Sequence, residues 1–251
     1  MGEPLHLAIC VPSLGTILTE TTLSISGMGI LNARHGIKQS VLMQQSASVS
    51  NCRNLLVHSA LEVNSDWTLW CDGDVAFNPD LAIRLLSHEK DIVGATYPRR
   101  VPPYITNGRF LSDLSDELVE ALFMPFGAML VKTEVFRKIR EPWFYESYKF
   151  EGIGPKQVTQ ALAHALNIDI PAGFVDDIAD ALCHYFPEAG EDDTRVTAHR
   201  GEDANFCREA RRAGYQIWCD MPLSRQMVHI GKQCVSIGAA VPGLASEKTA
   251  L

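Results

Sequence analysis

Hydrophobic positions follow two periods along the first hundred residues. Short, densely apolar runs at Leu5–Pro12 and Asp66–Cys71 are typical of buried strands. Between them, apolar residues recur at helical spacing over Thr19–Ala33 and Asn51–Leu61. This alternation predicts an α/β domain with a parallel sheet, in which Asp66–Cys71 is a central strand.

Three further elements fit the same alternation. The tripeptide Asn78-Pro79-Asp80 supplies an N-cap, a proline at the first helical position and an acid in the first turn, which predicts a helix to about His88. Residues Asp91–Tyr97 are a strand candidate, and Ser40–Met43 is a weaker one. The first hundred residues therefore make a strand–helix repeat.

The pattern changes in the second half of the chain. Two apolar runs within Glu117–Val131, split at Pro125, predict strands that join the edge of the sheet, and Glu134–Ile139 predicts a short helix. Glu202–Arg212 has one apolar stripe and one charged stripe, and a strand candidate follows at Tyr215–Cys219.

Two segments give no regular pattern. Residues 152–200 carry ambiguous signals and an acidic stretch, so we expect an irregular segment that acts as a lid or binding loop. Residues 236–251 are mostly small and polar, and we expect a flexible tail.

Composition narrows the class of protein. With 46% hydrophobic and 21% charged residues, the chain is typical of a folded globular domain. It contains no apolar run of the ~18 residues that a membrane span needs, and no secretory signal pattern, so we expect a cytoplasmic protein. The net charge of −8 disfavours nucleic acid as a partner, although it does not exclude a local basic groove.

The seven cysteines indicate reduced thiols. Their number is odd, several lie in apolar runs, and none forms a CxxC pair, so neither a disulfide framework nor a cysteine zinc site is expected.

Candidate chemistry begins at Asp72-Gly73-Asp74, directly after the predicted central strand. Open α/β sheets bind ligands at the carboxyl ends of their strands, and two carboxylates placed there suit a divalent cation. A solvated Asp-Gly turn is the alternative, and this motif alone does not decide between them.

Two later motifs favour the cation. Gly201-Glu202-Asp203 opens the amphipathic helix, and His229-Ile230-Gly231 follows near the end of the ordered pattern. In this order the three motifs resemble the glycosyltransferase A-type (GT-A) fold, in particular family 2-like enzymes, over roughly Leu5 to Gly231. The resemblance implies a single α/β domain over 1–251, Rossmann-like, with a mostly parallel sheet flanked by helices. Residues 1–100 would be its nucleotide-binding half and 101–235 its acceptor and metal half.

The resemblance also implies a metal site. Asp74 and His229 would ligate Mn²⁺ or Mg²⁺ that bridges the diphosphate of a nucleotide-sugar donor, most simply a UDP-sugar. Asp72 would reach the ribose or the metal through water. An imidazole ligand favours Mn²⁺. A histidine hydrogen-bonded to backbone is the alternative for His229.

On the acceptor side, the resemblance makes Asp203 the catalytic base, while Glu202 would position a hydroxyl group. An ordinary acidic first turn of a helix is the alternative for both. A carboxylate base on the acceptor side suits direct displacement with inversion. The sequence does not identify the acceptor. Donor contacts are implied for Pro12, Ser13, Arg53, Asn54, Asp72, Gly73, Arg99, Gly127 and Ala128, with solvated surface charges as the alternative for the two arginines.

Other functions fit less well. Asp72 and Asp74 also resemble the nucleophile and general acid of a haloacid-dehalogenase phosphatase, with Asp176-Asp177 as its later acidic pair. That family normally begins with the strand that carries the first aspartate, whereas here 65 residues with their own strand and helix precede that strand. A sugar-phosphate nucleotidyltransferase would need a glycine-rich basic loop, which residues 13–16 do not supply. An inactive nucleotide-sugar-binding protein is the non-enzyme alternative.

Overall fold

The computed structural model describes residues 4–99, 105–112, 114, 117–148, 160, 199–231 and 234–236. The predicted irregular segment 152–200 lies outside these residues except at its end and at 160, and so does the predicted tail after residue 236. The expectations for both segments stay predictions.

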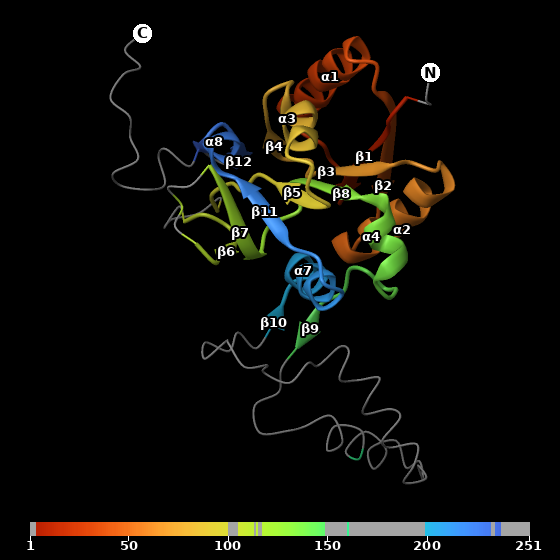
Figure 1. Ribbon diagram of the computed structural model, residues 1–251, viewed down its shortest axis with the longest axis vertical. Helices are drawn as coiled ribbons and strands as arrows, with labels where there is room; N and C mark the ends of the chain where they lie inside the picture. Colours follow the sequence, from red (N-terminus) through yellow and green to blue (C-terminus); the bar gives the residue numbers. More distant parts are fainter. Residues whose placement is uncertain are drawn as a thin grey trace.

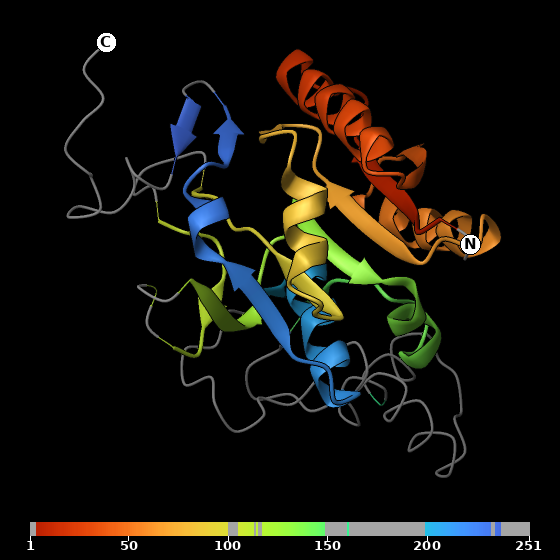
Figure 2. The ribbon, with the colours of Figure 1, turned by 45° about the horizontal axis from the view of Figure 1, so that its top comes forward.

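An eight-stranded sheet runs through the centre of the domain (Figures 1 and 2). Its strands lie in the order β2-β1-β3-β8-β5-β11-β7-β6. Their bounds are β1 His6–Ser13, β2 Lys38–Gln45, β3 Trp67–Cys71, β5 Ile92–Gly94, β6 Arg109–Phe110, β7 Leu118–Phe123, β8 Ala128–Lys132 and β11 Ile217–Asp220.

Most strands share one direction. β1 is parallel to both β2 and β3, and β5 is parallel to β11. β8 and β7 are antiparallel to each of their two neighbours in the sheet. The sheet is therefore the mostly parallel α/β sheet that the sequence predicted.

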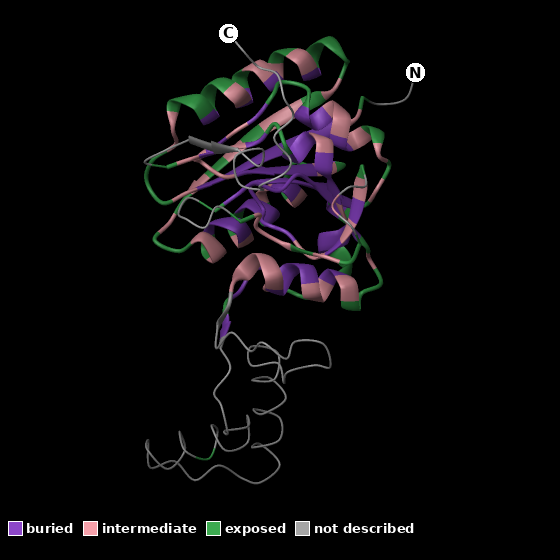
Figure 3. Cartoon of the chain, turned by 90° about the vertical axis from the view of Figure 1, so that its left-hand side faces the viewer, coloured by how far each residue is buried: buried purple, intermediate pink, exposed green. Residues whose placement is uncertain are grey.

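Two layers of helices cover the sheet, because each helix has an apolar face to bury. Buried residues of α2, α4 and α7 pack on one face, and those of α1 and α3 pack on the other, while the short α8 contributes Met221 to the first cluster and Leu223 to the second. Figure 3 shows the buried strands between these layers. The helices are α1 Thr19–Arg34, α2 Val49–Glu62, α3 Leu81–Ser87, α4 Thr133–Lys138, α7 Glu202–Arg212 and α8 Met221–Ser224.

Two small sheets flank the large one. β4 Val75–Ala76 and β13 Cys234–Ser236 pair with opposite edges of β12 Val228–Ile230. β9 Ser147–Tyr148 pairs with β10 His199–Arg200 immediately before α7. The first small sheet carries the histidine of the last motif back to the Asp72-Gly73-Asp74 loop.

The position of β8 corrects the prediction that the strands of Glu117–Val131 join the sheet edge. β7 does lie next to the edge strand β6, but β8 is inserted between β3 and β5. Every residue of β8 except Lys132 is buried, because neighbouring strands and helices cover both of its faces. Since β8 runs opposite to β3, its first residue, Ala128, lies beside Cys71 at the carboxyl end of β3.

The start of α3 also differs from the prediction. The helix begins at Leu81, so Pro79 precedes it, and Asp80 makes no side-chain cap. The Asn78 amide donates to Gln226 Oε1 at 2.7 Å instead of capping the helix. A long-range contact has replaced the local one here.

Five cysteines agree with the prediction of reduced thiols. Cys10, Cys52, Cys71, Cys207 and Cys219 are all buried and free. None of the helices in the described part of the chain combines the length and apolar character that crossing a membrane requires.

Gly94 provides a test of the central sheet. A Cβ at this position would lie 2.6 Å from the Ala128 carbonyl oxygen and 3.0 Å from Met129 Sδ. Because the first contact is with backbone of the neighbouring strand, Gly94→Ala should lower the free energy of unfolding by about 1 to 3 kcal/mol, as overpacking does. Chemical denaturation measures this change.

The matched control is Gly201→Ser, which adds a Cβ at a glycine with no atom within 4 Å of that position. Serine also suits the N-cap of α7, where Gly201 has a φ of −69°. The control should not lose stability, and an equal loss in both variants would contradict the packing argument.

Candidate active site

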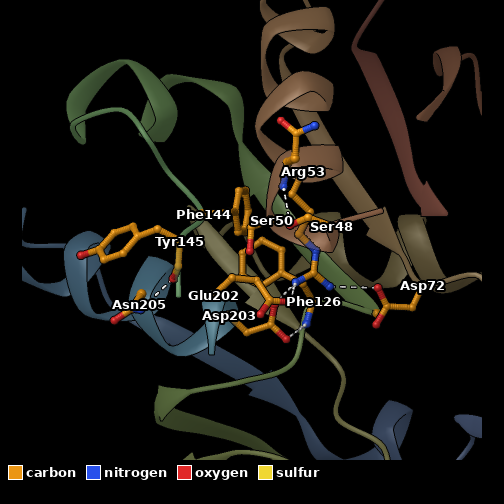
Figure 4. A network of polar contacts seen from close by, with 12 residues as sticks. Ser48, Ser50, Arg53, Asp72, Phe126, Phe144, Tyr145, Glu202, Asp203 and Asn205 are labelled. Carbon is orange, nitrogen blue, oxygen red and sulfur yellow. Dashed lines mark hydrogen bonds and ion pairs between the residues drawn. The ribbon is translucent and has the colours of Figure 1, made fainter. Parts of the chain in front are cut away.

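The centre of the candidate site is the buried guanidinium of Arg53 in the second turn of α2. Its Nη1 donates to Glu202 Oε1 at 2.8 Å and to Asp203 Oδ1, and its Nη2 donates to Asp72 Oδ1 at 3.0 Å (Figure 4). Three carboxylates from two distant parts of the sequence therefore meet at one side chain.

The surroundings of Arg53 explain how its charge is tolerated inside the fold. The rings of Phe126 and Phe144 lie 5.4 and 5.7 Å from the guanidinium carbon, a distance at which aromatic faces attract a cation. Burial lowers the pKa of Arg53, but Asp203, Asp72 and Glu202 more than offset this effect and raise it above its ordinary value. The side chain stays charged.

Asp72 follows β3 and is held from two directions. Arg53 binds its Oδ1, and the Tyr97 hydroxyl donates to its Oδ2 at 2.8 Å. Burial, reinforced by Asp72, raises the pKa of Tyr97 well above its usual range, so the phenol keeps the proton that it donates. The Gly127 N–H donates to the Tyr97 oxygen at 3.1 Å, which completes the chain of hydrogen bonds.

Only glycine fits at position 127, because a side chain there would clash with Tyr97 and Asp72. A Cβ there would lie 2.2 Å from the Tyr97 hydroxyl oxygen and 2.8 Å from Asp72 Oδ2. The antiparallel insertion of β8 brings this glycine to the carboxyl end of β3. The sequence resemblance placed Gly127 beneath the donor sugar, and that role stays a prediction.

Glu202 and Asp203 are the first two residues of α7, where they face Arg53 (Figure 4). The start of this helix is fixed by Asn205, whose amide donates to the Tyr145 carbonyl at 2.7 Å. The Phe126 N–H donates to Asp203 Oδ2 at 3.3 Å. The acidic first turn therefore binds partners from α2 and from the segment before β8.

The pKa of Asp203 is raised from 3.8 to about 7. Loss of water around the carboxyl is the main cause. Arg53 opposes the rise, and the negative charges of Glu202 and Asp72 add to it. One positive charge shared among three carboxylates is too little to keep all of them as acidic as they are in water.

Asp74 and His229 form a separate pair on the other side of the motif. His229 Nε2 lies 3.7 Å from Asp74 Oδ2, and the Ile230 N–H donates to the Asp74 carbonyl at 2.8 Å. His229 Nδ1 lies 2.8 Å from the Pro98 carbonyl oxygen, which can accept only if Nδ1 carries the proton. When the ring is neutral, this tautomer leaves Nε2 without a proton, and Nε2 is the nitrogen that lies toward Asp74, as in histidines that bind metals.

The fit of these residues to a divalent cation is partial. One imidazole and one carboxylate are suitable ligands for Mn²⁺ or Mg²⁺. Over the described residues, no group of three or more His, Cys, Asp or Glu side chains could hold a metal. Asp72 is engaged by Arg53 and Tyr97, so a cation at Asp74 and His229 would need further oxygen ligands from a bound diphosphate.

The remaining predicted donor contacts lie around the ends of β1, β3 and β8. Pro12 is buried at the end of β1, and the next residue, Ser13, accepts the Gly15 N–H at 3.0 Å. The Gly73 carbonyl accepts the Leu18 N–H at 2.8 Å. Ala128 is buried as the first residue of β8. These residues share one edge of the sheet.

Asn54 and Arg99, the other two predicted donor contacts, have different surroundings. The Asn54 amide donates to the Phe144 carbonyl at 2.7 Å and accepts the Phe144 N–H at 3.1 Å, so it fixes the backbone beside Arg53. Arg99 is exposed, and its N–H donates to the Ile105 carbonyl. Contact of either residue with a donor stays a prediction.

Three residues of the site had no role assigned from the sequence. Tyr97 stood out only by its position after a strand candidate, in a segment expected near the donor, and nothing in the sequence singles out Phe126 or Phe144. Nothing local in the sequence shows that Arg53 pairs with a residue 149 positions later.

Comparison with known families supports the predicted resemblance. Residues 16–107 match the family model Anp1, which describes GT-A-like glycosyltransferases. The matched range includes Arg53, Asp72 and Asp74 but neither Asp203 nor His229. No curated protein sequence matches the chain.

Solved structures with some likeness include A197 from STIV, with 17% identity and a TM-score of 0.42 over 56% of this chain and 71% of that one. A glycosyltransferase involved in the glycosylation of the major capsid of PBCV-1 has 14% identity and a TM-score of 0.33, over 56% and 70% of the two chains. HddC from Yersinia pseudotuberculosis complexed with GMP-PN has 10% identity and a TM-score of 0.30, over 52% and 78%. We assign no residue role from these likenesses.

The raised pKa of Asp203 has a consequence for stability. Because the folded protein holds this proton more tightly than the unfolded chain does, wild type should lose stability as pH rises from about 4 to about 7. Asp203→Asn keeps the shape and removes the charge. It should therefore unfold a few degrees above wild type at pH 8, and the difference should shrink toward pH 4.

Thermal unfolding across this pH range measures the effect. Glu134→Gln is the matched control, because Glu134 is also in the first turn of a helix but is half exposed. Its difference from wild type should not change in this way. A lower stability of Asp203→Asn at pH 8 would contradict the raised pKa.

Proposed function

We propose that this protein is a metal-dependent glycosyltransferase that moves a sugar from a nucleotide-diphosphate donor, a UDP-sugar, to a hydroxyl acceptor with inversion. The observation that carries the proposal is the position of Arg53 between Asp72, in the donor-side motif, and the Glu202–Asp203 pair. Groups that would act on the two sides of a transfer reaction belong to one site.

On the donor side, Asp74 and His229 would hold Mn²⁺ or Mg²⁺ together with phosphate oxygens. Such a cation supplies neutralisation of the charge that develops on a diphosphate leaving group. The hydrogen bond from His229 Nδ1 to Pro98 fixes the ring with Nε2 toward Asp74. Asp72, bound to Arg53 and Tyr97, would orient the donor instead of adding a third direct ligand.

On the acceptor side, Asp203 would accept the proton of the hydroxyl that attacks the anomeric carbon. A pKa of about 7 suits a base that works near neutral pH, since the carboxylate is available and still basic. Each of its oxygens accepts one hydrogen bond in the structure, and 27% of the side chain is exposed. An acceptor can therefore approach it.

The phosphatase alternative is less consistent with this geometry. An aspartate nucleophile needs an accessible oxygen, whereas both oxygens of Asp72 are engaged by Arg53 and Tyr97. In an inactive binding protein, the raised pKa of Asp203 would be only a consequence of burial and of its acidic neighbours. The match to a glycosyltransferase family favours transfer over both.

Removal of one predicted metal ligand tests the donor side. Asp74→Asn loses a full charge from the ligand set, so UDP affinity in the presence of Mn²⁺ should fall by tenfold or more (about 1.4 kcal/mol). Calorimetry with Mn²⁺ and with EDTA measures it, and Asp91→Asn, an exposed carboxylate change, is the control. Wild-type affinity that is equal with and without metal would contradict the proposed metal dependence.

Loss of the proposed base tests the acceptor side. Asp203→Asn should keep UDP binding and lose sugar transfer by roughly 10² to 10⁴-fold. In wild type the rate should rise with pH to a plateau, with a midpoint near 7, because only the ionised carboxyl accepts the proton. Release of UDP from UDP-sugars offered to a panel of hydroxyl acceptors measures both. Transfer within threefold of wild type would make Asp203 only a helix cap.

A further inference from the structure

Arg53 is placed unlike a nucleotide contact. Only 3% of its side chain is exposed, and its Nη1 and Nη2 both point at carboxylates of the protein (Figure 4). A guanidinium that bound a donor phosphate or base directly would have to reach the surface of the site. The chemistry of Arg53 is therefore directed toward Asp72 and Asp203.

We infer that Arg53 is the positioning residue of the site, and that its guanidinium holds Asp203 in place and sets its charge state jointly with Asp72. This inference rests on the proposed function only in naming Asp203 as a base. The linkage itself consists of contacts within this chain.

The shape of the side chain supports this role. One guanidinium nitrogen binds both Glu202 and Asp203, and a second binds Asp72. The planar, always charged fork of arginine can bridge groups on two sides, whereas the ammonium of lysine is a single point. Arginine can therefore join the loop after β3 to the start of α7.

The charges around Asp203 predict whether each substitution makes its ionisation harder or easier. Arg53 faces it from α2, and Phe126 contributes an N–H from the segment before β8. Its other neighbours that carry or could carry negative charge are Glu202 and Cys207 on α7, Asp72 after β3 and Tyr97 after β5. Removal of the Arg53 charge must make ionisation of Asp203 harder, and removal of the Asp72 charge must make it easier.

A purely structural role predicts something else. If Arg53 only packs between Phe126 and Phe144, its replacement lowers stability and activity but leaves the titration midpoint of Asp203 unchanged. The midpoint therefore separates positioning from packing.

The test is a pH titration of the folded protein labelled with ¹³C at the aspartate side-chain carboxyls and followed by NMR. The Asp203 signal is identified by its loss in Asp203→Asn. Arg53→Met should raise the midpoint by about 1 to 3 pH units, the range expected when a close opposite charge is lost. Arg53→Lys should stay closer to wild type, and Asp72→Asn should lower the midpoint.

Arg84→Met is the matched control, because Arg84 also binds a buried aspartate, Asp220, but belongs to α3 and lies outside the site. It should leave the Asp203 midpoint where it is in wild type. If Arg53→Met does not fold, the Asp203 midpoint in Asp72→Asn decides whether the inference holds. Shifts of opposite sign for Arg53→Met and Asp72→Asn support the inference, and an unmoved midpoint in the folded variants overturns it.

The titration needs neither donor nor acceptor, so it stands apart from the proposed function. A shifted Asp203 titration midpoint in a protein that transfers no sugar would support the link between Arg53 and Asp203 and contradict the proposed glycosyltransferase activity. Normal sugar transfer together with an unchanged Asp203 midpoint would support the activity and contradict the link.

Discussion

The charge balance at Arg53 is the constraint on which the site depends. One buried guanidinium binds carboxylates that arrive from the loop after β3 and from the start of α7. Removing the guanidinium would cost about 3 to 5 kcal/mol, because the carboxylates left behind would have lost both water and counterion. The bonds that surround it, from Asn54 and Asn205 to backbone carbonyls, fix the segments that carry these groups.

The same balance leaves the site short of positive charge. Three carboxylates share one cation, and the pKa of Asp203 rises to about 7 as a result of burial and of its acidic neighbours. A group that is costly to ionise in the folded state reduces stability, but it is also a stronger base than an aspartate in water. Functional sites often trade stability for reactivity in this way. In this structure the raised pKa of Asp203 comes first from loss of water around the carboxyl and then from the neighbouring Glu202 and Asp72 carboxylates.

Much of the frame could be predicted from the sequence because its signals are local. Dense apolar runs identified β1 and β3, helical spacing identified α1 and α2, and the acidic opening of α7 was visible in Gly201-Glu202-Asp203. Sheet order is not a local property. The insertion of β8 between β3 and β5 depends on contacts between distant strands, and the edge position expected from the sequence was wrong.

The candidate site also combines features that are local in the sequence with features that depend on distant contacts. The motif residues could be named from the sequence, but the direction of their side chains could not. Arg53 looked like a donor contact or a surface charge, and burial turns it inward. Asn54 looked like its partner at the nucleotide, yet its amide holds the Phe144 backbone. The Tyr97 hydroxyl can lie in the site only because Gly127, which has no side chain, leaves room for it.

A double-mutant cycle tests the central claim most directly. Free energies of unfolding at pH 8 would be measured for wild type, Arg53→Met, Asp203→Asn and the double variant. If Arg53 is the counterion of Asp203, its loss should cost less once Asp203 is neutral, with an interaction energy of about 0.5 to 3 kcal/mol. Additive effects of the two substitutions would show that the carboxyl and the guanidinium do not depend on each other, and would contradict the account.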